Sequence, residues 1–586
     1  MESSLFDQER LFKIAKKIDG QGYGSAYALL GAYDLGDGII LAIESIPKRP
    51  DFPLPGKVSL FLPFNLLGYN KEIILKDELA VIAAKHFFAE LTYQNLRYIG
   101  RNWLFLEPPG QAMLDRNSIE IYDEGIKINV AFYPPLKTKR KLSGGKIRRL
   151  FGESLNLLIE RIKATNKKRE LLEKMIKLIK AQEYLRRKLD EEGFVAFIAD
   201  GSILPREGNS DRPLKNAIPF EVPEKLKTSF KVPHFGEITG LAIEAGKVIS
   251  FAGANFHGKT TIIEALMQGH YNHVPGDGRE FVITVDELPL IAVENRRIVR
   301  GVDISFFMRS LPGDVDTSFF TTNEASGSTS QAASFMEALE LGVRGMVIDE
   351  DSSAVNFLVK DVLLKKIVPE DLEPITPLAE VAREISRTTN ASIIFAVGAL
   401  GELVRVSHVT YIVSNFKVSD KIEGSDSASL DSYLPRDALR LMRDEFLKEI
   451  KAIKIKISRE KKIKINRRFV SSESLPVMRA KSYSYDEIVF TSMGRRVIVD
   501  LRGSIRKTLK ERAQVRALAY AIEKIRVFMS EKKTLKDVVV ELIQKVRDEG
   551  LDILNPMPEY FLNFAMFTKW QLFYAISRLR NLKVLK

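Results

Sequence analysis

The stretch Val248-Ile-Ser-Phe-Ala-Gly-Ala-Asn-Phe-His-Gly-Lys-Thr260 decides the fold of this chain. From Gly253 onward it has the spacing G-x4-G-K-S/T of a phosphate-binding loop. Glycines let backbone N–H groups turn inward around phosphate oxygens, and the helix that starts there directs its positive end at the same anion. The five residues before the loop predict a buried strand, and 261–268 (TIIEALMQ) predicts a helix that Gly269 can end. The pattern therefore predicts a wound α/β domain that binds a nucleotide.

We expect different residues of the loop to bind the phosphates and the Mg²⁺ of Mg-ATP. Lys259 would place its ammonium on the β- and γ-phosphates, and Thr260 would offer its hydroxyl to Mg²⁺. A chance match is the alternative, and the predicted strand and helix on either side argue against it. The predicted nucleotide-binding residues of the loop are Gly253, Ala254, Asn255, Phe256, His257, Gly258, Lys259, Thr260 and Thr261.

Residues 346–351 (MVIDED) supply the second anchor that such a loop needs for its metal. A short apolar strand ends here in carboxylates. Asp349 is placed to hold Mg²⁺ together with Thr260, and Glu350 could polarise an attacking water. An ordinary buried strand with a solvated acidic end is the alternative, which the loop upstream makes less favourable.

A third motif, Ala325-Ser-Gly-Ser-Thr-Ser-Gln331, precedes a run whose apolar residues fall on one helical face. Small hydroxyl residues therefore crowd the start of a helix, which is suited to binding an anion. The predicted contacts with the nucleotide are Ser326, Gly327 and Ser328. A helix cap without a ligand is the alternative.

Together, the three motifs resemble an ABC-class ATPase, in which a signature L-S-G-G-Q at a helix start lies between the phosphate loop and the Walker B strand. Ser326 precedes Asp349 by 23 residues, the usual separation, and the sequence after the strand, 349–356 (DEDSSAVN), resembles the class pattern D-E-P-T-S-A-L-D. The chain is more closely similar to the predicted ABC-class ATPases of bacteria, archaea and some eukaryotes. The stretches that carry this similarity are 18–27 (IDGQGYGSAY), 195–214, 271–280, 324–333 and 347–361.

The resemblance implies a homodimer, because ABC enzymes hold ATP between the phosphate loop of one cassette and the signature of another. It implies Lys259, Ser326 and Glu350 as catalytic residues, and ATP and Mg²⁺ as cofactors. Some members of the smaller family have been linked to RNA, which favours RNA over DNA as the polyanion that this chain binds.

The chain also departs from the ABC pattern. The histidine that normally contacts the γ-phosphate should follow the strand 392–397, where this sequence has Gly398. His408 lies before the next strand and is interpreted as structural. A Q-loop glutamine is not evident, and Asp303 lies in the corresponding interval. These departures put the rate of hydrolysis in doubt more than nucleotide binding.

The segment 142–146 (LSGGK) matches the signature better than 325–331 does, but it precedes the phosphate loop by more than a hundred residues. We interpret it as a flexible turn in a basic segment. That segment, 137–149, has seven Lys or Arg in thirteen residues, and 451–468 has nine in eighteen, with an I-K-I-K-I alternation typical of a strand with one cationic face. Both segments suit a nucleic-acid backbone, and a solvated charged face is the alternative.

The 586 residues are enough for several domains, and the net charge of +13 suggests a polyanionic partner. We expect an α/β P-loop ATPase domain between α+β accessory domains. The predicted division is an N-terminal accessory domain 1–230, an ATPase domain 231–420, a linker 421–435 and a basic C-terminal domain 436–586.

With no cysteine, the chain has neither disulfides nor thiolate chemistry. Its apolar runs are shorter than a membrane-spanning helix, and no secretory signal is visible, so we expect a soluble cytoplasmic protein. Scarce Gln with abundant Lys, Glu and Ile suggests a thermophile.

The sequence thus predicts a soluble homodimeric ATPase that couples hydrolysis of Mg-ATP to binding of nucleic acid, with RNA favoured. The alternative is a nucleic-acid-binding module or switch that holds ATP with little turnover. A transporter ATPase is disfavoured by the basic accessory regions and the lack of membrane spans. A chromosome-clamp ATPase would need a long coiled coil between the phosphate loop and the signature.

Overall fold

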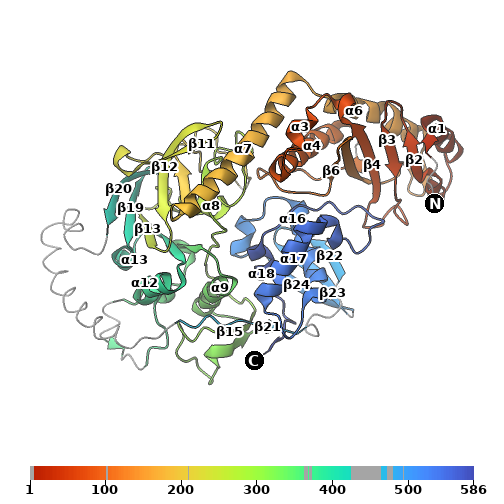
Figure 1. Ribbon diagram of the computed structural model, residues 1–586. Coiled ribbons are helices and arrows are strands. Elements are labelled where there is room, and N and C mark those ends of the chain that lie inside the picture. Colours follow the sequence, from red (N-terminus) through yellow and green to blue (C-terminus); the bar gives the residue numbers. More distant parts are fainter. Residues whose placement is uncertain are drawn as a thin grey trace.

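The computed structural model describes residues 5–99, 103–208, 210–361, 367–368, 372–423, 463–471, 479–492 and 494–585. We call residues 5–191 the N-terminal part, 194–423 the central part and 463–585 the C-terminal part, each within these described ranges. The three parts follow one another from red to blue in Figure 1. Most of the predicted linker and residues 451–462 of the second basic segment lie outside the described residues.

The N-terminal part is built on a seven-stranded sheet in the order β1-β2-β3-β4-β7-β5, with β6 also paired to β7. Helices α4 and α6 pack together beside it, and the long α7 leads from this part towards the central part (Figure 1). The strands are β1 (Phe6–Asp7), β2 (Gly31–Asp34), β3 (Ile40–Ile43), β4 (Gly56–Pro63), β5 (Leu104–Phe105), β6 (Ile119–Ile121) and β7 (Gly125–Phe132), with the short pair β8 (Leu136–Thr138) and β9 (Lys141–Leu142) beyond them. The helices are α1 (Gln8–Lys17), α2 (Phe64–Leu67), α3 (Lys71–Ile74), α4 (Glu78–Ile99), α5 (Gly144–Arg149), α6 (Leu155–Ile162) and α7 (Asn166–Glu191).

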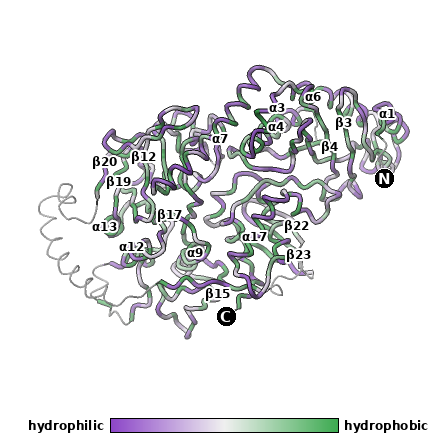
Figure 2. Tube along the Cα trace, viewed as in Figure 1, coloured by the Kyte–Doolittle hydropathy of each residue, from purple (hydrophilic) through white to green (hydrophobic). Residues whose placement is uncertain are grey.

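The helix α7 is amphipathic along its length. Its buried residues, among them Leu172, Met175, Ile176 and Ile179, recur at helical spacing. Hydrophobic and hydrophilic residues accordingly alternate along its trace (Figure 2). One end of α7 packs on α4 and the other on β10, so a single helix belongs to the packing of two parts.

The central part contains the sheet that the phosphate loop requires. Strands β17 (Gly345–Asp349), β18 (Ser392–Val397), β13 (Val248–Ala252) and β19 (Val409–Ser414) are adjacent and parallel, and β20 (Lys417–Glu423) closes the edge antiparallel. Every residue of β17 and β18 is buried. Continuous apolar strands are expected where helices cover both faces of a parallel sheet.

A second, antiparallel sheet has the order β11-β12-β10-β14. Its strands are β10 (Phe194–Ala199), β11 (Thr228–Val232), β12 (Gly236–Glu244) and β14 (Val282–Thr284), and a separate hairpin-like pair is β15 (Val299–Val302) with β16 (Phe320–Thr322). The helices of the central part are α8 (Lys259–Gln268), α9 (Gly327–Leu341), α10 (Val355–Leu358), α12 (Leu378–Thr389) and α13 (Gly401–Val406). Because β10 pairs with β12, the sheet crosses the predicted boundary at residue 230, and that division remains a proposal.

The C-terminal part combines a three-stranded antiparallel sheet with a helical cluster. The sheet holds β22 (Arg479–Tyr483), β23 (Glu487–Ser492) and β24 (Arg495–Asp500), and β21 (Phe469–Val470) pairs with β25 (Val584–Leu585). The helices are α16 (Arg512–Lys524), α17 (Leu535–Glu549) and α18 (Lys569–Ser577). Near the C-terminus, aromatic residues that could in principle stack on bases are instead buried, which favours core packing, and only the later ones lie in α18. They are Tyr560, Phe561, Phe564, Phe567, Trp570, Phe573 and Tyr574.

The C-terminal part contacts both other parts of the molecule. Glu511 pairs with Arg116 of the N-terminal part at 3.3 Å, and both side chains are almost fully buried. Lys510 donates to Gln268 at the end of α8 (2.6 Å). Helix α18 packs against α9, and the two share one continuous apolar core.

The segment 142–146 is not the flexible turn that the sequence suggested. Leu142 ends β9, and Gly144 begins α5. A Cβ at Gly144 would lie 2.0 Å from the carbonyl oxygen of Ala15. The backbone N–H of Gly144 donates to the carboxylate of Asp19 (2.8 Å). The glycine therefore allows α5 to pack closely on α1.

The second basic segment also differs from expectation where it is described. Residues 463–468 form no strand, and Arg468 is 1% exposed, so its guanidinium is unavailable to a phosphate backbone. In the described ranges, no helix is both long enough and apolar enough to cross a lipid bilayer.

Candidate nucleotide-binding site

The loop between β13 and α8 has the tight backbone that its two glycines permit. Gly258 has φ of +96°, and a Cβ there would lie 2.4 Å from the ring of Phe416. A Cβ on Gly253 would lie 2.2 Å from the carbonyl oxygen of Val413. Val413 near the end of β19 and Phe416 after it thus lie against the loop, and they exclude any larger side chain at both positions.

Phe256 lies between these glycines in a strained and exposed position. Its φ is +66°, a region that a bulky residue seldom adopts, and its side chain is 97% exposed. At the next residue, His257, Nδ1 accepts a hydrogen bond from the backbone N–H of Asn415 (2.9 Å), which leaves the proton of the neutral imidazole on Nε2.

The ammonium of Lys259 is held against its own loop. It donates to the carbonyl oxygens of Gly253 and Ala254, each at 2.7 Å, and the residue is buried. A buried ammonium with only neutral acceptors is well placed to exchange them for phosphate oxygens, because hydrogen bonds between charged groups are stronger.

The two residues predicted to hold Mg²⁺ are in contact. Thr260 Oγ1 donates to Asp349 Oδ2 at 2.8 Å, which brings the start of α8 to the end of β17. Burial raises the pKa of Asp349, and the hydrogen bond from Thr260 opposes that rise. A cation beside this buried carboxylate would favour its charged form. One carboxylate and one hydroxyl suit Mg²⁺, which usually takes its other ligands from phosphates and water.

Glu350 is held by the loop that follows β18. Its carboxylate accepts from the backbone N–H groups of Gly398 (2.8 Å), Ala399 (3.1 Å) and Leu400 (3.2 Å). At Gly398, where ABC enzymes usually have histidine, a Cβ would lie 2.7 Å from Asn255 Oδ1. The phosphate loop and the Glu350 carboxylate therefore meet at the same short loop.

The signature residues lie at the start of α9. Ser326 is exposed, and its hydroxyl bonds that of Thr329 (2.9 Å), while Ser328 donates to Asn356 after the Walker B strand (3.1 Å). Within the described residues, no hydrogen bond joins Ser326, Gly327 or Ser328 to the phosphate loop. The sequence-predicted site residues thus form two groups, one on the phosphate loop with Asp349 and Glu350, the other on α9.

A residue beside the signature helix that the sequence reasoning missed is Glu294. Residues 289–291 run beside β17, where Ile291 N–H donates to the carbonyl oxygen of Val347 (2.9 Å), so the chain emerges next to the Walker B strand. Asp303, which stood in the Q-loop interval, instead accepts from its neighbour Ser305. A carboxylate directly after the apolar run 288–293 was the available signal.

Glu294 joins the signature helix to the C-terminal part. Its N–H donates to Ser330 Oγ of α9 (3.1 Å), and its carboxylate accepts from Tyr574 (2.8 Å) and Arg578 (2.7 Å). Burial alone would raise the pKa of Glu294, but the charges of Arg578 and Arg297 outweigh it and lower this pKa to about 2.

This pairing is part of a larger buried ionic network, which we call the α9 network. Arg297 and Arg578 both bond Glu337 on α9, at 3.0 and 2.9 Å. Arg468 bonds Glu340 on the same helix at 2.7 Å. Its members are Glu294, Arg297, Glu337, Glu340, Arg468, Tyr574 and Arg578.

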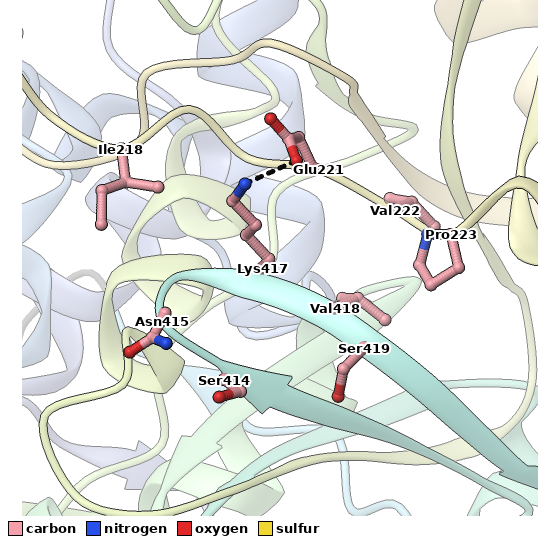
Figure 3. Close-up of a pocket in the computed structure, with 9 residues that line it drawn as sticks. All are labelled: Ile218, Glu221, Val222, Pro223, Ser414, Asn415, Lys417, Val418 and Ser419. Carbon is pink, nitrogen blue, oxygen red and sulfur yellow. Dashed lines mark hydrogen bonds and ion pairs between the residues drawn. The ribbon is translucent and has the colours of Figure 1, made fainter.

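A surface pocket borders the phosphate loop (Figure 3). Its volume is about 750 Å³, and it is bounded by the segment 218–223 on one side and by 414–419 on the other. Lys417 and Glu221 form an ion pair at its wall (2.6 Å). The pocket adjoins the loop through Asn415, whose N–H bonds His257.

Three family models match the chain in succession. The model described as the N-terminal region of ATPases of the ABC class matches residues 8–166, and the P-loop domain of the ABC ATPase model matches 168–438. The chain belongs to the ABC-class P-loop ATPase family. The third model, the MRB1590 C-terminal domain, matches 492–585 of this ABC-class ATPase. The predicted family and the predicted α/β P-loop fold with accessory regions are thereby confirmed, and membership supports ATP binding.

Individual relatives of this ABC-class ATPase are less informative. An uncharacterized protein of Methanocaldococcus jannaschii, MJ1628, is 36% identical over 212 residues, which are 35% of this chain and 46% of that protein. The match thus spans about half the length of that curated relative.

Two solved structures of transporter subunits are also similar. One is cbiO1 from Clostridium perfringens, part of the ABC transporter complex cbiONQ, with 11% identity, a TM-score of 0.27 and coverage of 44% of this chain and 99% of that one. The other is an ATP-binding subunit of an ABC transporter, with 15% identity, a TM-score of 0.25 and coverage of 42% and 98%.

Proposed function

We propose that this chain is an ATPase that hydrolyses Mg-ATP at composite sites in a homodimer and couples the reaction to binding of nucleic acid, with RNA favoured. The contact of Thr260 with Asp349 carries the proposal, because it joins the phosphate loop to the Walker B strand as Mg-ATP binding requires. Family membership supports the nucleotide; turnover, the dimer and the RNA are the proposed steps.

Each residue of the site has a separate role in the proposed reaction. Lys259 binds and orients the terminal phosphates, and the N–H groups of the phosphate loop complete the cradle. Thr260 and Asp349 would hold Mg²⁺, which when bound neutralises charge on the phosphates. Glu350 orients the attacking water and accepts its proton.

The homodimer follows from where the signature lies. Ser326 is exposed at the start of α9, with its hydroxyl bonded only within that helix start among the described residues. A second copy can therefore present Ser326 to a nucleotide on the phosphate loop of the first.

Mixing two inactive variants tests the dimer. Lys259→Ala removes the ammonium that would contact the phosphates, and Ser326→Arg blocks the signature. If the sites are shared, mixed dimers contain one intact composite site and recover part of the wild-type rate. No recovery in a mixture shown to exchange subunits would contradict shared sites.

The nucleic-acid surface is best supported on the N-terminal part. All seven cations of 137–149 are exposed, and in the described structure only Arg149 has an acidic partner, Glu153 at 3.6 Å. Helix α1, packed on α5, adds further exposed cations: Arg10, Lys13, Lys16 and Lys17. Such a face binds a phosphate backbone through counterion release, so affinity should fall steeply with salt.

Phosphate release by wild type and Glu350→Gln, with and without single- and double-stranded RNA and DNA, tests the whole proposal. We expect a wild-type rate well above that of the variant and a further increase with RNA. A wild type no faster than Glu350→Gln under every condition would overturn hydrolysis. It would favour the second candidate, an ATP-holding switch, which the absence of a histidine at Gly398 supports.

The pocket of Figure 3 is our proposed place for the nucleoside of ATP. It adjoins the phosphate loop through Asn415 and offers both apolar and polar walls, as ligand pockets usually do.

A further inference from the structure

We propose that the backbone of residues 398–400 positions Glu350 for hydrolysis. This inference rests on the proposed ATPase function and adds a positioning element to it. The loop connects the end of β18 with the start of α13, at the carboxyl ends of the parallel strands, where the phosphate loop also begins.

Three successive N–H groups converge on one carboxylate. Oε2 of Glu350 accepts from Gly398, Ala399 and Leu400 at 2.8, 3.1 and 3.2 Å, and Oε1 accepts from Ala399 at 3.1 Å. Successive backbone N–H groups that point to one centre form a concave anion site. Both oxygens of Glu350 are therefore fixed, and the orientation of the carboxylate is set by backbone.

The same loop touches the phosphate loop, which ties the position of Glu350 to that of the phosphates. A Cβ at Gly398 would lie 2.7 Å from Asn255 Oδ1, 3.7 Å from Lys259 Nζ and 3.8 Å from Lys259 Cε. A histidine at 398 would displace Asn255. The glycine thus leaves room for the side-chain amide of Asn255, which any side chain at position 398 would have to displace.

The position of Glu350 matters because a general base works only within hydrogen-bond reach of the water it activates. A displacement of about 1 Å can cost roughly a hundredfold in rate. Loosening the loop should therefore lower kcat. It should leave KM nearly unchanged, because the N–H groups of 399 and 400 bond Glu350 and not the phosphate loop.

The principal variant is Ala399→Pro, which removes the N–H that serves both oxygens of Glu350. Ala399→Ser keeps the N–H and is the matched control. Leu400→Pro is a second variant, because φ at Leu400 is −85°, close to the range that proline adopts. Gly398→Ala and the double variant Gly398→Ala/Asn255→Gly test the contact with the phosphate loop, since removal of the Asn255 side chain makes room for the added methyl.

Steady-state ATP hydrolysis, ATP affinity and thermal melting are measured for each variant. We expect Ala399→Pro and Leu400→Pro to lower kcat about tenfold or more with KM and ATP affinity within about twofold of wild type, and Ala399→Ser to resemble wild type. Adding Ala399→Pro to Glu350→Gln should cause little further loss, because both changes act through one group. Asn255→Gly should restore part of the activity that Gly398→Ala removes.

Two results would overturn the inference. If either proline variant melts and binds ATP like wild type and also keeps kcat within about twofold, the loop does not position Glu350. If the proline change lowers the rate of Glu350→Gln as much as that of wild type, it acts elsewhere. Both results require an active wild type, so they differ from failure of the proposed function, in which wild type is no faster than Glu350→Gln and both proposals fall.

Discussion

The two halves of the proposed composite site are built differently. On the phosphate loop, Lys259 bonds carbonyl oxygens of its own loop, and Phe256 is almost fully exposed. On α9, thirteen of fifteen residues are buried, and its two glutamates belong to the α9 network. The phosphate loop can exchange its internal bonds for a ligand, whereas α9 is fixed to the C-terminal part. A movement of the signature should therefore carry the C-terminal part with it.

Breaking the α9 network should give the largest effect. Arg578→Ala leaves Glu294 and Glu337 with fewer partners in a buried setting, and loss of one member of a buried ion pair costs about 3–5 kcal/mol. Urea unfolding monitored by fluorescence measures the loss. Arg580→Ala, at an exposed neighbouring position, is the control and should change stability little. Equal stability of the two variants would contradict a strongly coupled α9.

Lys259→Ala tests the phosphate-loop half of the proposed composite site. We expect ATP affinity to fall roughly a hundredfold, because a charge-assisted contact with the phosphates is lost. The unfolding midpoint should barely change, since the ammonium bonds only its own loop. Titration with a fluorescent ATP analogue measures affinity. The control is Lys247→Ala, directly before β13 and away from the phosphate loop. A large loss of stability in Lys259→Ala would show that the loop is structural as well.

Acid should weaken the α9 network through Glu294. The pKa of Glu294 is lowered to about 2, against about 4.3 in an unfolded chain, so its contribution is present above the unfolded value and is lost as pH falls towards 2. The free energy of unfolding should thus fall less steeply between about pH 4 and 2 in Glu294→Gln than in wild type. Glu541→Gln, an exposed position, should keep the wild-type slope.

The smallest effect is expected at the pocket beside the loop. Ser419→Trp would fill part of the space beside segment 218–223, so ATP affinity should fall a few-fold. Binding of inorganic tripolyphosphate, which has no nucleoside, should be unchanged. Isothermal titration measures the affinity for ATP and for tripolyphosphate separately. Equal loss of affinity for both ligands would mean that the substitution disturbs phosphate binding and not nucleoside binding.

Much of the local structure followed from the sequence. The strands 248–252 and 392–397 have the predicted bounds, because a buried parallel strand is a short apolar run ended by polar or turn residues. The contact between Thr260 and Asp349 also followed, since loop and strand are separate local patterns that meet at one edge of a parallel sheet.

What the sequence did not reveal depends on contacts between distant residues. The segment 142–146 looked flexible because its glycines gave no sign of the close approach of α5 to Ala15. Arg468 looked like part of a cationic face, and only the fold shows that it pairs with Glu340, more than a hundred residues earlier. Glu350 could be expected to act on water, but its backbone partners lie nearly fifty residues later.

The position of the C-terminal part has a consequence for how this protein can change over evolutionary time. It meets the N-terminal part at Arg116 and Glu511, α8 at Gln268 and Lys510, and α9 through the network around Arg578. A domain joined by a simple tether can be exchanged by recombination. Here a replacement would have to arrive with matched polar and charged partners on three separate surfaces, so the accessory region and the cassette are expected to be inherited together and to accumulate substitutions in pairs.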